Sequence, residues 1–356
     1  MDPGPAFAQS FSRLSTLAVL LVPLLLIAAG ADLLGDRTIE RIATTLFINV
    51  ALVVGLQIFM GNSGILSFAH IGFMGIGAYA SVLFSMAPRV KAFALPDLYP
   101  FLADIQLPFL AAVFIGAAVA GLIAALISYP LMRLSDAAAV ITSFALLVVI
   151  HNVLVHWKTV TNGPQTLFGV TRHTDLWTSA LCGVAFVVLA YWFKESRFGL
   201  QLRASRNDRT AAATSGVDIV VVRWIGFVLS AFVAGFAGAL WAHFITSFSP
   251  TAFYLKETFV ILAMLVIGGP GSVSGAVVGT LVVTAVFETL RGAENAINIQ
   301  KLFANPVVGL TEIVLAVAMI GILILRPSGI MGGRELGWPT GARLGTARSA
   351  AAGRAR

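Results

Sequence analysis

Residues 61–80 read GNSGILSFAHIGFMGIGAYA, which combines glycine-rich packing with polar groups inside a strongly apolar run. Small residues recur here at helical spacings that let a neighbouring backbone approach closely, as helix contacts in membranes require. They are Gly64, Ser67, Gly72, Gly75 and Ala78. Asn62, Ser67 and His70 are polar groups that lipid does not tolerate unpaired. We therefore expect this stretch to lie inside a helix bundle in a membrane.

A second stretch has the same pattern. The series Gly61-x-x-Gly64-x-x-Ser67-x-Ala69-x-x-Gly72 recurs as Gly268-x-x-Gly271-x-x-Ser274-x-Ala276-x-x-Gly279. Paired glycine-interrupted segments in two halves of a chain indicate a transporter with an internal repeat and a substrate path at the repeat interface. The alternative is that small residues are simply common in membrane helices. The pattern predicts structural glycine breaks at Gly61, Gly64, Gly268, Gly269 and Gly271.

Composition indicates an all-α polytopic membrane protein. Hydrophobic residues make up 58% of the 356 residues and charged residues 11%, and the mean hydropathy is +0.92. That leaves too little polar surface for a water-soluble globule. The net charge of +7 lies in loops and in the tail, without the aromatic and basic face that binds nucleic acid. The single cysteine, Cys182, excludes an intrachain disulfide and a cysteine metal cluster, and we expect no metal and no cofactor.

About ten apolar runs approach the length needed to cross a bilayer, about 20 residues. They are 15–34, 39–60, 64–87, 108–128, 137–157, 177–193, 224–246, 257–268, 273–290 and 307–325. We interpret the first as a retained helix, not a signal peptide. The run 257–268 is short, and it is either a half-helix or begins before Glu257. Residues 1–14 precede this transmembrane domain, 15–325. A basic tail predicted to be disordered, 326–356, follows it.

The distribution of basic residues predicts the orientation. The loop 194–223 has six Lys and Arg residues against three acidic ones, and the tail is also rich in arginine. By the positive-inside rule both are cytoplasmic, which requires an even number of crossings between them. Splitting the run 257–290 at Gly268–Gly271 gives four crossings there and ten in total. Both termini are then predicted to be cytoplasmic. Within the loop we expect a helix over about 200–214, closed by Gly216 as a C-cap.

Five segments resemble one family, in the same order. The stretch 61–79 resembles the "GxxSLGHAAFFGIGAY" segment of the permease subunits of bacterial ABC importers for branched-chain amino acids, of the LivM type. The loop 196–217 resembles that family's "SRFGRALRAIRENExAAEALGI" segment, and shorter matches lie at 161–164, 231–239 and 268–271. The resemblance covers about 40–330. Departures lie at Leu200, Asn207, Asp208 and Ala213, and the helix over 137–157 lacks a glutamate that many members carry.

The resemblance implies a type II ABC importer-like permease of about ten helices in the bacterial inner membrane. Its implied partners are a second, LivH-like permease subunit, two cytoplasmic ATP-binding subunits and a periplasmic substrate-binding protein. This chain has no G-x-x-x-x-G-K-[ST] phosphate loop, so ATP hydrolysis must come from another chain. The loop helix would be the coupling helix that contacts the ATPase. The residues assigned to this coupling are Arg203, Arg206, Asp208, Arg209 and Gly216.

The candidates for the translocation path are Asn62, Ser67, His70, Ser274 and Glu312. Each has a structural alternative, because helix-to-helix hydrogen bonds place similar residues inside membrane bundles. For His70 we favour such a structural hydrogen bond. Glu312 lies inside the last apolar run, where a carboxylate is functional by default, but it could also reach interfacial water or pair with Arg291 or Lys301. Glu288, near the end of its helix, could likewise reach interfacial water.

Three functions from different classes remain open. The favoured one is a permease subunit of an ATP-driven importer of branched-chain or other apolar amino acids, with a urea or short-chain amide importer as the alternative within that architecture. An ion-coupled secondary transporter would need several buried carboxylates, and only Glu312 and Glu288 qualify. A membrane enzyme would need clustered acids or histidines, yet the five histidines are scattered; His151 and His156 are spaced i, i+5 and do not share a helix face.

Overall fold

The computed structural model describes residues 5–299, 309–325, 328–333 and 335–336. In these ranges the chain is helical, and a single β-bridge joins Leu167 to Phe248. The longer helices are α1 (Pro5–Leu34), α2 (Arg37–Ser63), α3 (His70–Ser85), α6 (Phe109–Leu131), α7 (Asp136–His156), α9 (Leu176–Glu195), α10 (Arg197–Asn207), α12 (Ile219–Ile245), α13 (Leu255–Gly268), α14 (Val273–Ile299) and α15 (Leu310–Leu325). The short elements are α4 (Pro88–Ala94), α5 (Pro100–Ala103), α8 (Lys158–Thr161), α11 (Arg209–Thr214) and the 3-10 helix η1 (Pro250–Phe253).

Every apolar run predicted from the sequence contains a helix, which confirms the all-α polytopic fold. Within the described residues, eight helices are long and apolar enough to cross a membrane. The helices α3 and α15 also coincide with predicted runs but have only 16 residues each. Helix α13 has 14 residues, roughly 21 Å, which is shorter than the hydrocarbon core of a bilayer. Together with η1 it reaches the length of a span, over Pro250–Gly268.

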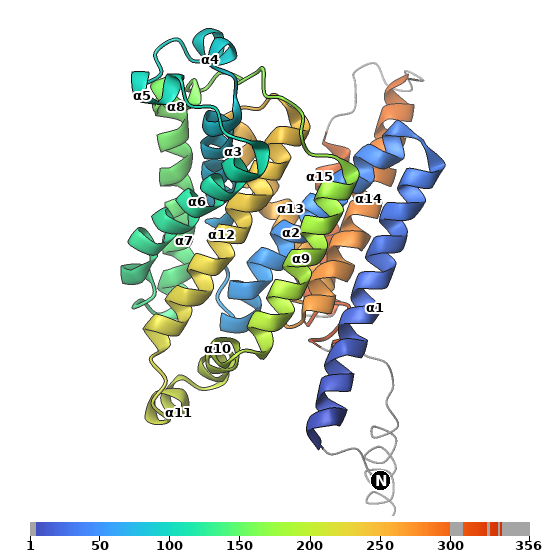
Figure 1. The fold of residues 1–356 in the computed structure, drawn as a ribbon. Helices are drawn as coiled ribbons and strands as arrows, with labels where there is room; N and C mark the ends of the chain where they lie inside the picture. Colours follow the sequence, from blue (N-terminus) through green and yellow to red (C-terminus); the bar gives the residue numbers. More distant parts are fainter. Residues whose placement is uncertain (1–4, 300–308, 326–327, 334, 337–356) are drawn as a thin grey trace, which may run out of the picture.

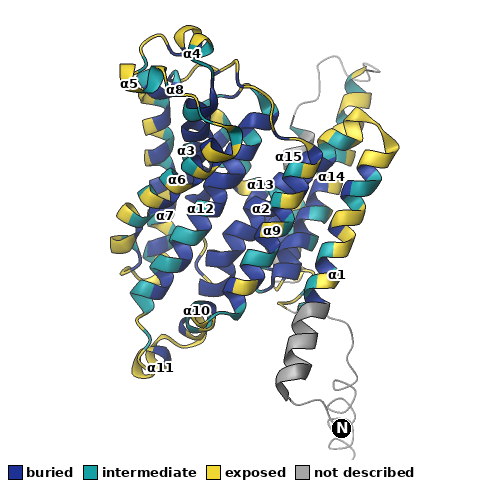
Figure 2. Ribbon diagram, viewed as in Figure 1, coloured by how far each residue is buried: buried dark blue, intermediate teal, exposed yellow. Residues whose placement is uncertain are grey.

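Helix α2 lies at the centre of the bundle, because its surface is apolar on all sides. Over its most apolar 18 residues, 83% of positions are buried, against 22% for α1 and 33% for α7. Figure 2 shows this gradient, with dark blue on α2 and α12 and yellow on the outer faces of α1 and α7. A helix without a polar face is stable only when other helices or lipid surround it.

Three helices meet at glycines. A Cβ atom added to Gly77 of α3 would lie 2.1 Å from the carbonyl oxygen of Gly235 in α12, and one added to Gly116 of α6 would lie 2.6 Å from the carbonyl oxygen of Gly77. Such distances exclude any side chain, so the backbones touch directly; the sequence predicted close packing in 61–80, but at other residues than Gly77. Among the glycines of 61–80 the closest approach is at Gly77, whereas Gly72 and Gly75 contact the side chains of Ile150, Leu154 and Phe253.

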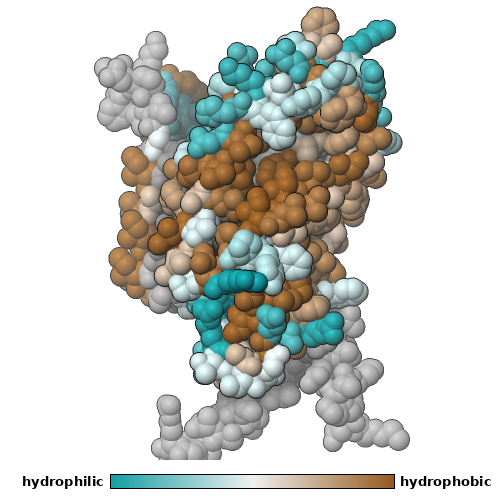
Figure 3. All heavy atoms as spheres, turned by 90° about the vertical axis from the view of Figure 1, so that its left-hand side faces the viewer, coloured by the Kyte–Doolittle hydropathy of each residue, from teal (hydrophilic) through white to brown (hydrophobic). Residues whose placement is uncertain are grey.

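The outer face of α6 and α7 is apolar. Leu122, Leu126, Ile141 and Val149 are 56% to 72% exposed there. Figure 3 shows hydrophobic side chains across the middle of this face, with hydrophilic ones gathered toward both ends. A surface of this kind is expected where lipid, not water, surrounds the protein.

The two ends of the bundle differ in their connections. Figure 1 places α4, α5 and α8 at one end and α10 and α11 at the other, and α1 begins at the α10 end. Both glycine breaks lie at this α10 end, and a Cβ atom added to Gly61 would lie 2.2 Å from the carbonyl oxygen of Pro270. The two breaks predicted from the sequence are therefore in contact.

The first break begins later than predicted, because Gly61 lies in the last turn of α2, and the run 64–87 is not one helix. Residues 64–69 are not helical, because Gly64 ends α2 in the left-handed conformation (φ +75°) and α3 begins only at His70. Non-helical backbone at membrane depth is tolerated where protein surrounds it. The two repeats do not correspond position by position, since Ser67 lies in this break whereas Ser274 is the second residue of α14.

Candidate translocation site and coupling elements

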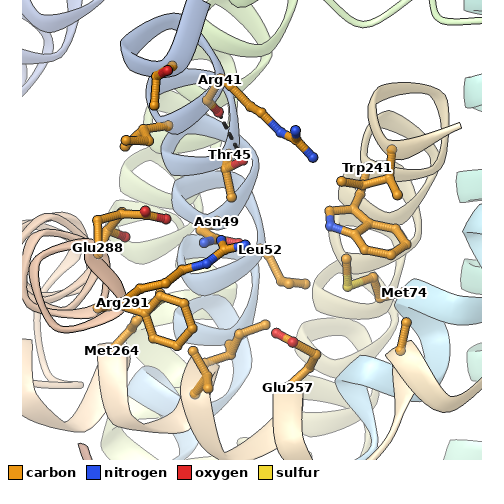
Figure 4. Close-up of a pocket in the computed structure, with 18 of the residues that line it drawn as sticks. Arg41, Thr45, Asn49, Leu52, Met74, Trp241, Glu257, Met264, Glu288 and Arg291 are labelled. Carbon is orange, nitrogen blue, oxygen red and sulfur yellow. Dashed lines mark hydrogen bonds between the residues drawn. The ribbon is translucent and has the colours of Figure 1, made fainter. Parts of the chain in front are cut away.

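A cavity of about 550 Å³ lies between α2, α3, α12, α13 and α14, in the half of the bundle remote from α10. One wall comes from the first half of α2, between Thr38 and Leu52. The opposite wall comes from α13 and from the second half of α14. Figure 4 shows Glu257 pointing from α13 into this space and Arg291 reaching from α14 toward α2, with Trp241 of α12 on the far side.

The cavity combines apolar walls with charges of both signs. Leu52, Met74 and Met264 are buried and give it an apolar lining. Two acidic and two basic side chains reach the same space, namely Glu257, Glu288, Arg41 and Arg291. The hydroxyl of Thr284 is buried and has no hydrogen-bond partner among the described residues. Such a lining can accept an ammonium group, a carboxylate and an apolar side chain in one molecule.

None of the described path candidates lines this cavity; all lie toward the α10 end. The amide of Asn62 donates to the carbonyl oxygen of Ile58 (2.9 Å), and its Oδ1 has no partner among the described residues. The hydroxyl of Ser67 is buried and also lacks a partner there. Glu312 belongs to α15, but its side chain lies outside the described residues. Their roles in a path remain predictions.

His70 is part of a buried hydrogen-bond network between helices. Its Nε2 lies 2.6 Å from the hydroxyl of Ser230 in α12, and this hydroxyl also donates to the carbonyl oxygen of Gly55 in α2 (2.6 Å). A hydroxyl has one proton, so when Ser230 donates to Gly55, the Nε2–H of His70 must be the donor to Ser230. The network thus joins α2, α3 and α12 and fixes the tautomer of His70.

The second break is closed by residues 328–333 and 335–336, which belong to the tail predicted to be disordered. The amides of Ile330 and Met331 donate to the carbonyl oxygens of Ile267 and Gly268 at the end of α13 (2.9 and 3.0 Å). The carboxylate of Glu335 accepts from Ser274 at the start of α14. These contacts supply the capping partners that helix ends buried in protein need. The remainder of the tail lies outside the described residues.

Arg203 and Arg206 point toward the chain itself. The guanidinium of Arg206 donates to the carbonyl oxygen of Gly61 (2.7 Å), and that of Arg203 to the carbonyl oxygen of Lys194 (2.7 Å). Arg209 lies 3.4 Å from Asp136 at the start of α7. In these contacts the three arginines hold the loop against the bundle.

The predicted loop helix over 200–214 is wrong in one respect, because it is interrupted at Asp208. This residue is extended (φ −151°), and its carboxylate accepts from the amides of Thr210 and Ala211 (2.8 and 3.0 Å). An aspartate that caps a new helix competes with continuation of the old one, which divides the segment into α10 and α11. Gly216 follows α11 in the left-handed conformation (φ +82°), as a C-cap requires.

The sequence did not point to most of the cavity. Glu288 and Arg291 were considered, but only as groups near a membrane surface. Arg41, Glu257 and Trp241 were missed, because each lies near the end of its apolar run and looks like an interfacial residue. The sequence did contain one signal: charges of opposite sign recur at one end of the bundle, near the starts of α2 and α13 and in the second half of α14. Within the described residues, no group of three or more His, Cys, Asp or Glu is placed to hold a metal ion.

A bundle of membrane-spanning helices around an amphipathic, charged cavity defines the chain as a multi-pass membrane permease. Residues 38–324 match the family described as the permease component of branched-chain amino acid transport systems, and the chain belongs to this family. It is accordingly a transport subunit and not itself a catalytic enzyme.

Two of the individual relatives are named as branched-chain amino acid permeases and a third as a nucleoside permease. The high-affinity branched-chain amino acid transport system permease protein LivM of Escherichia coli K12 is 27% identical, over 81% of this chain and 72% of the relative. The probable branched-chain amino acid transport permease protein LivH of Methanocaldococcus jannaschii is 24% identical, over 80% and 88%. The nucleoside ABC transporter permease protein NupC of Lactococcus lactis is 31% identical, over only 25% of this chain and 30% of the relative. No solved structure gives a significant match.

Proposed function

We propose that this permease carries branched-chain or other apolar amino acids through the cavity between α2 and the α13–α14 pair. The observation that supports this substrate class is the lining of the cavity. An apolar amino acid is a zwitterion, so it needs a cation, an anion and an apolar surface within a few ångströms of one another. Arg291, Glu257 and Met264 offer these three in one space.

The remaining components of the importer are part of the same proposal. We infer that the chain pairs with a second, LivH-like permease, with two cytoplasmic ATP-binding subunits and with a periplasmic binding protein that delivers the solute. It would lie in the bacterial inner membrane with the α10 end in the cytoplasm, as the basic residues of the loop 194–223 favour. The cavity would then lie in the outer half of the membrane, on the side of delivery.

The exposed surface of α11 is the best candidate for contact with an ATP-binding subunit. Arg203 and Arg206 already bind the chain's own backbone, whereas Arg209, Thr210, Ala211 and neighbouring residues are exposed beyond them. An ATPase that holds α11 would move α10 with it, since the two helices follow directly in sequence. This movement would be a rigid-body shift of the kind that drives alternating access.

Transport by the reconstituted complex tests this proposal. The chain is co-expressed with its candidate partners, reconstituted into liposomes, and supplied with binding protein, ATP and radiolabelled leucine. We expect ATP-dependent leucine uptake, and a rate about tenfold lower for Arg291→Gln, because loss of one charge-assisted hydrogen bond costs about 1.5 kcal/mol or more. The control Lys158→Gln removes an exposed charge on α8, away from the cavity, and should leave uptake unchanged.

Other outcomes would contradict specific parts of the proposal. Uptake of urea without uptake of leucine would overturn the substrate class and retain the importer. Uptake driven by an ion gradient in the absence of ATP-binding subunits would overturn the importer itself. Equal leucine uptake by Arg291→Gln and Lys158→Gln would show that the solute does not use this cavity charge.

A further inference from the structure

Both walls of the cavity are held at their α10 end by the same part of the chain. The α2 wall ends near Gly61, whose carbonyl oxygen binds Arg206 of α10. The α13–α14 wall turns next to Lys194, the last residue but one of α9, which lies three residues before α10 begins at Arg197. We propose that Lys194 and Glu335 are positioning residues for transport, which join the start of α14 to α10 so that a displacement of α10 moves both walls together. This inference rests on the proposed function.

The first step of the argument is that Glu335 belongs to α14 in space although it follows α15 in sequence. Its carboxylate accepts from the amides of Val273 and Ser274 (both 2.9 Å) and from the hydroxyl of Ser274 (2.5 Å). The next amide, of Gly275, is capped by the hydroxyl of Ser272 (3.0 Å). The first amides of α14 are thereby satisfied, and a negative charge lies at the positive end of the helix dipole.

The second step is the ion pair. The ammonium group of Lys194 contacts the carboxylate of Glu335, and the two side chains are 6% and 20% exposed. Burial by itself would raise the pKa of Glu335. The positive charge of Lys194 and the hydrogen bonds from Lys194 and Ser274 outweigh it, so the pKa lies below its usual value. Glu335 is therefore ionised at neutral pH, and we call Lys194, Ser274 and Glu335 the Glu335 latch.

The third step connects the latch to α10. Arg203 of α10 donates to the carbonyl oxygen of Lys194 (2.7 Å), and Lys194 also reaches the carbonyl oxygen of Gly271 in the second break (3.4 Å). Gly199, near the start of α10, lies so close to the end of α9 that an added Cβ would be 2.2 Å from the carbonyl oxygen of Phe193. Gly199 thus packs directly on the backbone of Phe193 and Lys194.

The fourth step is the distance over which a movement would travel. Along α14, Thr284 of the cavity lies roughly 15 Å from Ser274 of the latch, and along α2, Leu52 lies roughly 14 Å from Gly61, at 1.5 Å per residue. Continuous helices transmit a displacement over such distances as rigid bodies. Holding both helices at one end by α10 therefore converts a movement of α10 into a change in the cavity.

A purely structural role is the alternative, and a double variant separates the two. Either single variant, Lys194→Met or Glu335→Gln, leaves a charge partly buried and unpaired, which destabilises a protein whatever its function. The double variant Lys194→Met/Glu335→Gln leaves no unpaired charge, and the glutamine oxygen can still accept from the start of α14. If the pair serves stability alone, the double variant should behave like the wild type.

The experiment measures leucine moved per ATP hydrolysed by the whole complex in liposomes. We expect the double variant to assemble with wild-type stoichiometry and to keep basal ATPase activity, while its ratio of leucine to ATP falls about tenfold. The matched control is Glu195→Gln, which neutralises the neighbouring acid, 3.9 Å from Arg203, without touching the latch. A double variant with the wild-type ratio would overturn the inference.

A second measurement does not depend on altering the latch. Cys182 is replaced by serine, and spin labels are placed in pairs at exposed positions of the intact complex. The first distance joins Asn207 on α10 to Thr289 on α14. The second distance joins Thr289 to Val149 on α7. On addition of ATP we expect the first distance to stay constant and the second to change. A changed first distance would show that α14 does not follow α10 and would overturn the inference. A wild-type complex that hydrolyses ATP without moving leucine contradicts the proposed function, and the inference falls with it.

Discussion

Replacing Gly77 by alanine tests the backbone contact between α3 and α12. The new Cβ would lie 2.1 Å from the carbonyl oxygen of Gly235 and 2.4 Å from its Cα, whereas ordinary contacts begin at 3.4 Å. The two helices must therefore separate by about 1 Å. Overpacking of this kind lowers the free energy of unfolding by about 1–3 kcal/mol, and the higher helix propensity of alanine offsets about 1 kcal/mol of this loss. We expect a net loss of up to roughly 2 kcal/mol.

Gly121→Ala is the matched control, because it makes the same chemical change in the middle of α6. Its Cβ would meet the nearest atom, Cβ of Phe232, at 3.4 Å, so we expect no loss and a gain of up to about 1 kcal/mol. The measurement is equilibrium unfolding of both variants in mixed dodecyl maltoside and SDS micelles. If Gly77→Ala is as stable as Gly121→Ala, α3 and α12 do not touch at Gly77, and the close-packing argument is wrong.

Three further predictions use the same unfolding assay or hydrogen exchange. Ser230→Ala should lower the free energy of unfolding by about 1–3 kcal/mol, because it leaves the buried His70 without a partner. The control Thr142→Ala loses only a local bond to Ala138 and should lower it by less than about 1 kcal/mol. Equal losses in the two variants would contradict the network. Asp208→Ala should speed amide exchange at the start of α11 without lowering global stability, since it removes a helix cap; unchanged exchange would show that α11 needs no cap. The depressed pKa of Glu335 means that its stabilisation is complete above the ordinary value of 4.5 and is lost as pH falls through the pKa of the folded protein. Wild-type stability should therefore fall with acidification below that value, and a Glu335→Gln variant with the same acid-dependent loss would refute this assignment.

The loop 194–223 shows where reasoning from sequence succeeded and where it ended. Its basic, alanine-rich pattern correctly predicted helix in this segment, because helix propensity and a C-capping glycine are local properties. The interruption at Asp208 was not predicted, since a capping aspartate in the middle of a helix-forming stretch depends on which backbone amides it finds. The inward direction of Arg203 and Arg206 depends on α9 and α2, and nothing near those residues in the sequence indicates it.

The cavity shows a different limit. Opposite charges near the ends of apolar runs look like interfacial residues in a sequence, and most of them are. Only the packing of α2, α13 and α14 around a common space places Arg41, Glu257 and Arg291 together. The path candidates named from the sequence were polar groups inside apolar runs. The described ones lie at the glycine breaks, where Ser274 serves as part of a helix cap.

The sequence alone determined the membrane-spanning class, the approximate position of each apolar helix and the approximate position of the two glycine breaks. These follow from hydropathy and from local conformational preference, which act over a few turns of one segment. Tertiary structure alone decided that the two breaks touch, that the charges of three helices share one cavity, and that Glu335 caps a helix that begins 62 residues before it. Those features depend on contacts between segments far apart in the chain, and local preference carries no information about them.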